Sequence, residues 1–124
     1  MKNLLLIFAG GGVGSVLRYA LSRWINGINT SPFPYGTFLV NIIGCFLIGF
    51  IIFYTERYGD QADHWRLLLV TGLCGGFTTF SAFSLENVQL LSDQKIFVFL
   101  AYTIGSVALG IVATYCGLRI GRAI

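Results

Sequence analysis

Charged residues are scarce in this sequence. Only 10% of its 124 residues are Asp, Glu, Lys or Arg, whereas 56% are hydrophobic. A soluble domain carries roughly 25% charged residues, and a chain this small could not bury so much apolar surface within itself. The composition therefore excludes an ordinary soluble domain and predicts a protein whose surface lies in lipid.

Other shortages exclude several kinds of site. The single histidine, His64, lies in a polar stretch, so a histidine-based catalytic apparatus has almost nothing to work with. The three cysteines, Cys45, Cys74 and Cys116, are an odd number without CxxC spacing, which indicates neither a disulfide framework nor a zinc site, and we interpret them as small buried apolar residues. The eight basic residues form no cluster, so no nucleic-acid partner is expected. No nucleophile–base pair is visible, so we predict that the chain is not an enzyme.

Long stretches with at most one charged residue fill most of the chain. A membrane-spanning helix needs about 20 mostly apolar residues. Charged and polar segments leave four such stretches, at residues 4–22, 35–54, 67–91 and 96–118. We therefore predict an all-α membrane protein whose residues 1–124 form a single four-span membrane domain.

Four spans place both termini on one side of the membrane. The basic residues divide five against two or three between the two sides, a weak positive-inside bias that would permit insertion in both orientations. The first residues have the pattern of a signal peptide, but the apolar character continues to Leu17, so we expect them to remain as the first span.

Small residues recur four positions apart, as in Gly10 with Gly14 and Gly117 with Gly121. Such pairs allow helix backbones to approach closely in lipid. Four short helices cannot enclose a pathway and also pack a full core. We therefore expect a homo-oligomer, of which the two-fold dimer is the commonest form.

The third span contains a segment that is poorly suited to a continuous helix. Its sequence TGLCGGFTTFSAFS places two consecutive glycines, then Thr78 and Thr79, at mid-span. Glycine lowers helix propensity, and threonine competes for backbone hydrogen bonds. A broken helix at membrane depth is tolerated only where protein covers it or where it lines a wet cavity, and its released carbonyls can coordinate a cation. The alternative is a glycine kink that serves close packing.

The same segment carries two aromatic residues one helical turn apart. Phe80 and Phe83 share a helix face, and Ser81 and Ser84 repeat the spacing beside them. One interpretation is an ordinary lipid-facing or packed aromatic pair. The other uses the positively polarised ring edges, which could stabilise a small anion weakly enough for it to leave again.

Polar residues also occur within the second and fourth spans. An unpaired amide at Asn41 would cost roughly 4 kcal/mol or more in hydrocarbon, so its side chain must face a partner or a pore. Tyr102, Ser106, Gly110 and Thr114 recur every four residues and form one stripe on a helix. The hydroxyls of this stripe serve either helix packing or a ladder of neutral donors along an anion path.

Two charges lie near the ends of predicted spans. Arg18 either extends to the membrane interface or places a positive charge in an aqueous vestibule. A carboxylate on a narrow anion path would repel the ion. We therefore expect Glu86, at the end of the third span, to pair with a basic or amide group.

Three segments together resemble one known family over the whole chain. GGGVGSVLRY, VNIIGCFLIG and TGLCGGFTTFSAFSLE resemble the Fluc family of fluoride channels, also called CrcB. The resemblance implies an antiparallel, dual-topology homodimer in the bacterial cell membrane, with two pores that pass fluoride passively out of the cytoplasm and reject chloride. Its partners would be fluoride, a second copy of the chain and the lipid bilayer.

The resemblance also implies roles for individual residues. A structural sodium ion would lie on the two-fold axis, held by backbone carbonyls of Gly75 and Thr78 at the broken third helix. Arg18 and Glu86 match characteristic charged positions of the family. The fluoride pathway is expected at Asn41, Thr79, Phe80, Ser81, Phe83, Ser84, Tyr102 and Ser106.

Other functions fit the sequence less well. A small multidrug-type, proton-coupled transporter also has four spans and dual topology, but it needs a carboxylate embedded in the membrane. The first span has none, and Glu86 lies at the end of a span. A non-transporting assembly factor, or a small subunit of a larger complex, is the remaining alternative.

Overall fold

Helices make up almost the whole of the chain. The computed structural model describes residues 1–124, with the side chain of Tyr58 excepted. Three long helices are continuous: α1 (Lys2–Gly27), α2 (Tyr35–Thr55) and α6 (Ile96–Ala123). The third pass is segmented, and its parts are the 3₁₀ segment η1 (Glu56–Gln61), α3 (Ala62–Trp65), the π-helical segment η2 (Arg66–Cys74), α4 (Gly75–Phe77) and α5 (Phe80–Ser92).

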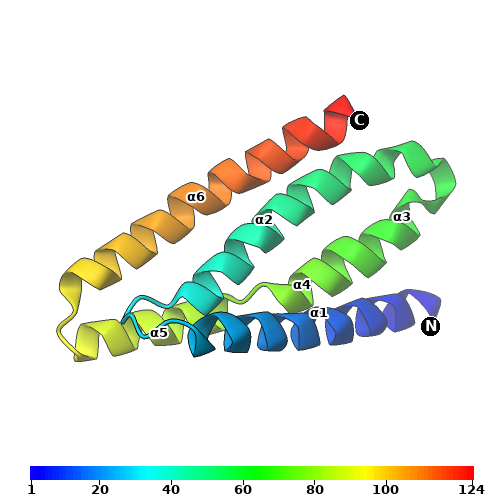
Figure 1. The fold of residues 1–124 in the computed structure, drawn as a ribbon. Helices are drawn as coiled ribbons and strands as arrows, with labels where there is room; N and C mark the ends of the chain where they lie inside the picture. Colours follow the sequence, from blue (N-terminus) through cyan, green and yellow to red (C-terminus); the bar gives the residue numbers. More distant parts are fainter.

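Four helical passes are long and apolar enough to cross a membrane. They are Lys2–Gly27, Tyr35–Thr55, Gly59–Ser92 and Ile96–Ala123. Both termini lie at the same end of the molecule as α3, and the α1–α2 loop and the α5–α6 turn lie at the other end (Figure 1). The predicted all-α, four-span fold is therefore confirmed.

The turn between α5 and α6 has a specific local cause. The chain leaves α5 at Gln94, which has a φ of 58°, the left-handed conformation found just beyond many helix ends. The Lys95 N–H donates to the Leu90 carbonyl and the Gln94 N–H to the Leu91 carbonyl, both hydrogen bonds near 3.0 Å. These bonds satisfy the last carbonyls of α5 and turn the chain back at once into α6.

Glycines allow the helices to approach closely at two places. A Cβ atom at Gly14 would lie only 2.2 Å from the Leu73 carbonyl oxygen, so α1 packs directly on the backbone of η2. A Cβ atom at Gly117 would lie 2.2 Å from the Phe46 carbonyl oxygen, so α6 packs in the same way on α2. The close packing predicted from the glycine pairs of the first and fourth spans is confirmed.

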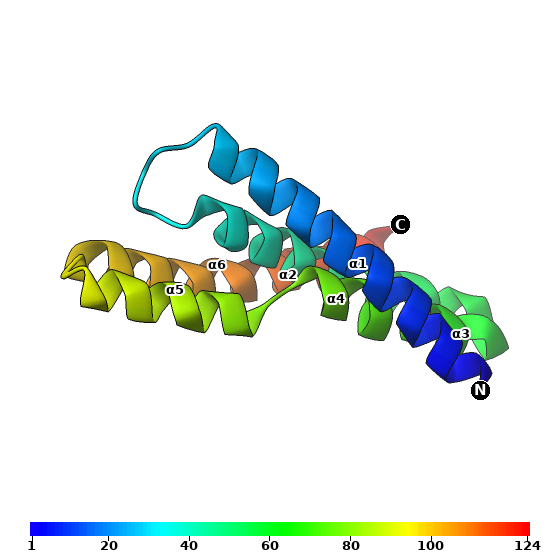
Figure 2. The ribbon, with the colours of Figure 1, turned by 90° about the horizontal axis from the view of Figure 1, so that it is seen from below.

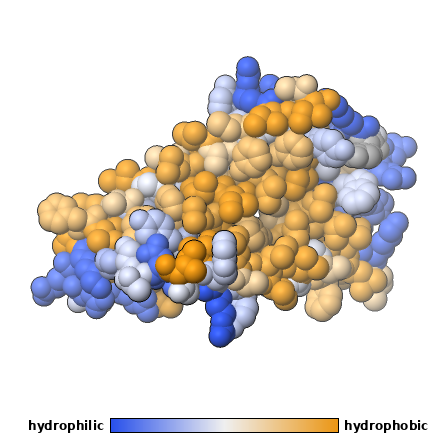
Figure 3. Space-filling view, viewed as in Figure 1, coloured by the Kyte–Doolittle hydropathy of each residue, from blue (hydrophilic) through white to orange (hydrophobic). Residues whose placement is uncertain are grey.

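The outer surface is largely apolar, as expected for a protein in lipid. Large side chains such as Phe8 and Phe97 are 81% and 89% exposed. Figure 3 shows apolar residues over most of the middle of one face and hydrophilic residues toward its margins. Cys74 is buried, but the expectation of burial is wrong for Cys116, which is exposed on α6, since lipid makes burial unnecessary for an apolar residue.

Candidate ion pathway

The third pass is interrupted by two residues in extended conformation. Thr78 and Thr79 have ψ values of 159° and 116°, so α4 ends before them and α5 begins after them. Figure 2 shows this extended link between the two helices. The prediction of a broken helix, rather than a simple kink, is therefore confirmed.

The threonine side chains satisfy part of the broken backbone. The Thr78 hydroxyl donates to the Cys74 carbonyl at 2.9 Å, alongside the Thr78 N–H, which donates to the same oxygen. The Thr79 hydroxyl accepts from the Ala82 N–H at 3.1 Å and so caps the first turn of α5. Both threonines therefore favour the interruption at this point of the chain.

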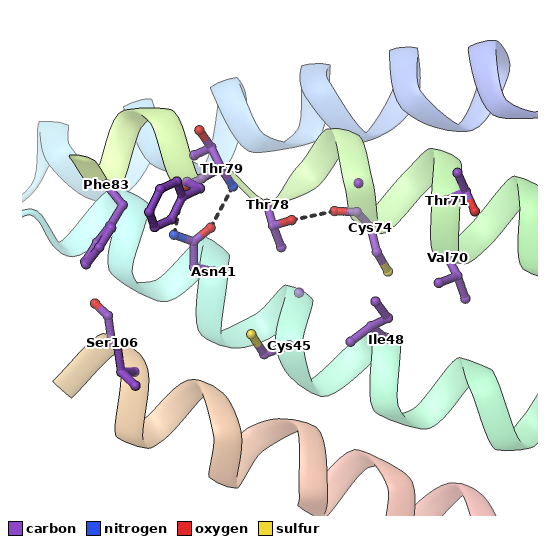
Figure 4. Close-up of a pocket in the computed structure, with 14 residues that line it drawn as sticks. Asn41, Cys45, Ile48, Val70, Thr71, Cys74, Thr78, Thr79, Phe83 and Ser106 are labelled. Atoms are coloured by element: carbon purple, nitrogen blue, oxygen red, sulfur yellow. Dashed lines mark hydrogen bonds between the residues drawn. The ribbon is translucent and has the colours of Figure 1, made fainter. Parts of the chain in front are cut away.

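Asn41 binds the backbone at the break. Its Nδ2 donates to the Thr79 carbonyl at 3.1 Å, and its Oδ1 accepts from the Thr79 N–H at 2.8 Å (Figure 4). The amide thus has a partner, the first alternative left open by the sequence. It also lines a cavity, and a primary amide has two N–H donors, one of which remains for a second partner.

Two backbone carbonyls beside the break accept no hydrogen bond from the described residues. Among the hydrogen bonds of the described residues, none ends on the carbonyl oxygen of Gly75 or Thr78. Both residues line the same cavity, and Gly75 is exposed. The two residues predicted as sodium ligands therefore line one cavity, and no described group donates to their carbonyl oxygens.

A cavity of about 530 Å³ lies beside the break, between α2, the third pass and α6. Its wall is mostly apolar. The Ser106 hydroxyl, from α6, is buried and has no hydrogen-bond partner among the described residues. The predicted site residues that line this cavity are Asn41, Gly75, Thr78, Thr79, Phe80, Phe83 and Ser106.

The two phenylalanines differ in exposure. Their ring centroids are 5.8 Å apart, which confirms that they share a helix face. The Phe83 ring is half-buried and lies 5.1 Å from the Tyr102 ring, whereas Phe80 is 80% exposed on a single copy of the chain. Neutral donors and aromatic rings therefore meet at one end of the cavity, with one of the rings directed outward.

Glu86 is held by two hydroxyl groups. Thr37 donates to its Oε1 and Tyr102 to its Oε2, both at 2.6 Å. The prediction of a basic or amide partner is therefore wrong. Helices α2 and α6 each place a hydroxyl beside Glu86, and no ion pair of the described residues involves its carboxylate. The Tyr102 hydroxyl, which was expected to donate to the anion on its path, instead donates its hydrogen to the Glu86 carboxylate.

Comparison with known proteins agrees with this architecture. Residues 5–118 match the family described as CrcB-like protein, Camphor Resistance (CrcB). The chain belongs to the CrcB-like family. A relative from Phocaeicola vulgatus is 54% identical over 118 residues, covering 95% of this chain and 97% of its own length. A relative from Flavobacterium psychrophilum is 48% identical over 122 residues, covering 98% of both chains.

The names of these CrcB-like relatives are specific. Both, and a third from Oceanobacillus iheyensis that is 45% identical over 97% of this chain and 92% of its own, are named fluoride-specific ion channel FluC. These are names of ion channels rather than of enzymes. With its four spans, the chain is a multi-pass protein of a bacterial membrane.

Besides Glu86 and Tyr102, three predicted site residues of this CrcB-like chain do not line the cavity. Ser81 is exposed and its hydroxyl lies 3.2 Å from that of Thr79, and Ser84 is half-buried on α5. Arg18 is half-buried on α1, and it takes no part in the two ion pairs of the described residues, Arg66–Glu56 and Lys95–Asp93. Of the predicted site residues, the cavity beside the break is therefore lined without these three and without the bonded pair Glu86 and Tyr102.

Sequence reasoning missed Thr37 and Gly44. Thr37 precedes Asn41 by one helical turn, a spacing that marks both as polar residues on one face of the second span. A Cβ atom at Gly44 would lie 2.1 Å from Thr78 Cγ2, so Gly44 makes room for the break. The sequence feature that could have indicated this role is a single glycine one helical turn after Asn41.

Proposed function

We propose that this chain forms a fluoride-selective channel, through which fluoride leaves the bacterial cytoplasm passively. The observation that carries the proposal is the Ser106 hydroxyl, which is buried at the cavity beside the broken helix and finds no partner in the described part of the chain. Buried polar groups are nearly always hydrogen-bonded, so an unused donor in this position is available to a small anion. The CrcB-like relatives named fluoride-specific ion channel FluC support the same conclusion.

The chemistry of the cavity suits a small, strongly hydrated anion. Fluoride must exchange its water for other donors, and the free N–H of Asn41 and the Ser106 hydroxyl are uncharged donors. The ring edges of Phe80 and Phe83 add weak positive potential. Neutral groups of this kind bind the ion without the full charge that would hold it too tightly for conduction.

The walls of the cavity also favour passive movement over proton coupling. No Asp, Glu, His, Lys or Arg occurs among the described residues that line it. A multidrug-type transporter would need a carboxylate there, and Glu86 instead accepts hydrogen bonds from Thr37 and Tyr102 beyond the cavity. This arrangement supports a channel.

The functional unit that we propose is an antiparallel, dual-topology homodimer. Phe80 is 80% exposed at the cavity that its own subunit lines, and Gly75 is exposed beside it. A second copy that covers this face would bury both residues and would bring its own Phe80 to the pathway. The weak charge bias of the sequence is compatible with two copies inserted in opposite orientations.

A structural sodium ion fits the free carbonyls at the break. Hard cations prefer oxygen ligands, and the carbonyl oxygens of Gly75 and Thr78 have no other partner within the described residues. Two subunits related by a two-fold axis would together supply four such oxygens. When bound there, the ion would supply a fixed positive charge that ties the two broken helices together.

The proposal is tested by reconstituting the purified chain alone into liposomes loaded with potassium fluoride. With a potassium ionophore present, we expect fluoride to leave rapidly down its gradient, at a rate that an imposed pH gradient does not drive. Vesicles that release fluoride only in response to a pH gradient would indicate a proton-coupled transporter and refute a passive channel.

A further inference from the structure

Helix α5 carries both pathway rings but has little backbone connection to the rest of the fold. It is joined to α4 only through the extended residues Thr78 and Thr79, and it turns directly into α6 at its other end. Its orientation must therefore be set by side chains that reach across to neighbouring helices. The contacts of Asn41 and Glu86 already described are two of these.

A third contact lies outside the pathway. The Thr103 hydroxyl, on α6, donates to Asn87 Oδ1 at 2.9 Å. Asn87 Nδ2 donates in turn to the Phe83 carbonyl at 3.0 Å, one turn earlier in α5. Asn87 is only 8% exposed, so both halves of its amide are used within the protein.

The position of Asn87 on α5 connects it to the rings. Phe80, Phe83 and Asn87 follow the i, i+3, i+7 spacing of one helix face. The bond from Asn87 to the Phe83 carbonyl fixes the amide on this face, and Thr103 then binds the amide from α6. A rotation of α5 about its own axis would break the Thr103 bond while it moved both rings.

The contact also sets the register of α5 along α6. Neighbouring residues of α6, Tyr102 and Thr103, donate to neighbouring residues of α5, Glu86 and Asn87. A shift of α5 by one helical turn would break both hydrogen bonds together. Two adjacent pairs therefore specify one alignment, where a single pair would allow α5 to pivot.

We propose that Asn87 and Thr103 are positioning residues for the Phe80 and Phe83 rings. The inference rests on the proposed fluoride function, because it assigns these residues an effect on ion selection. Neither residue lines the cavity. The pair acts on the ion only through the placement of the rings.

The first test compares variants that differ by one hydroxyl. Thr103→Val keeps the shape of the side chain and removes the donor, and we expect fluoride efflux from liposomes to fall on the order of tenfold, with a smaller preference over chloride. Thr103→Ser keeps the donor and should conduct like the wild type. Ser92→Ala is the matched control, since the Ser92 hydroxyl donates only within α5, to the Val88 carbonyl.

The second test measures the helix itself. Hydrogen exchange of the purified protein should be faster in residues 80–92 for Thr103→Val than for Thr103→Ser, with exchange in residues 66–74 unchanged. Asn87→Ala combined with Thr103→Val should lower flux no further than either change alone, because the two side chains act as one unit.

The possible outcomes separate this inference from the function on which it rests. Wild-type vesicles that retain fluoride would refute the proposed function and the inference together. If the wild type conducts and Thr103→Val conducts equally well, the positioning role alone is overturned. It is also overturned if Thr103→Ser is as impaired as Thr103→Val, because the loss of efflux would then not depend on the hydroxyl. Unchanged hydrogen exchange in α5 for Thr103→Val would overturn it as well, because the hydroxyl would then not hold the helix.

Discussion

The side-chain amide of Asn41 takes the place of a backbone partner for Thr79. It donates to the Thr79 carbonyl and accepts from the Thr79 N–H, with distances of 3.1 and 2.8 Å. A peptide group in a neighbouring strand would make the same two bonds. The extended link in the third pass is therefore stabilised by one residue of α2, and the pathway beside it depends on that residue.

Replacement of Asn41 by alanine removes both of these bonds. We expect the variant to lose about 2 kcal/mol of stability, because the N–H and carbonyl of Thr79 become unsatisfied in a buried position. Thermal unfolding of the detergent-solubilised protein measures the loss, and fluoride efflux should fall with it. An unchanged midpoint together with unchanged efflux would contradict the role assigned to Asn41.

Replacement of Gly44 by alanine tests the space around the break. The added Cβ would lie 2.1 Å from Thr78 Cγ2, so Thr78 must move, and we expect a loss of about 1–3 kcal/mol together with loss of fluoride efflux. Gly12→Ala is the control, since a Cβ there meets nothing within 4 Å. Equal stability and efflux in the two variants would show that the contact has no consequence.

Replacement of Phe80 by isoleucine tests the ring edges. The apolar side chain remains but the ring quadrupole is lost, so we expect fluoride efflux to be abolished while the dimer still assembles. Phe97→Ile, at an 89% exposed position on α6, should leave efflux unchanged. Efflux and size-exclusion chromatography measure the two properties, and normal efflux through Phe80→Ile would exclude a role for the ring.

Replacement of Tyr102 by phenylalanine tests the partners of Glu86. The change removes one of two hydroxyl donors from a half-buried carboxylate, and we expect a loss of about 1–3 kcal/mol in thermal unfolding. Tyr115→Phe is the control, because Tyr115 is 59% exposed on the same helix. If both variants unfold at the wild-type midpoint, the hydrogen bond to Glu86 contributes no stability.

The four spans and the break could be predicted because their causes are local. Scarce charge sets the length of each span, and the two glycines before Thr78 and Thr79 weaken the helix within the sequence itself. The close packing at Gly10 and Gly117 could also be predicted, because each has a second glycine four residues later. The π-helical segment Arg66–Cys74 has no comparable local signal and was not predicted.

The partners of the polar residues could not be predicted in the same way. Whether Glu86 meets a cation, an amide or a hydroxyl depends on the register of α2 and α6 against α5, which the spacing within one helix does not determine. Burial was also unpredictable at Cys116, because lipid accepts an apolar side chain as readily as the protein core does.

For selective conduction, the uncharged donors in the cavity must replace the water around fluoride without supporting chloride. Initial efflux of fluoride and of chloride, measured with ion-selective electrodes from matched liposomes that contain only this protein, tests the claim directly. We expect rapid fluoride efflux and chloride efflux no faster than from protein-free liposomes. Fluoride retained as in protein-free liposomes, or chloride released as fast as fluoride, would contradict it.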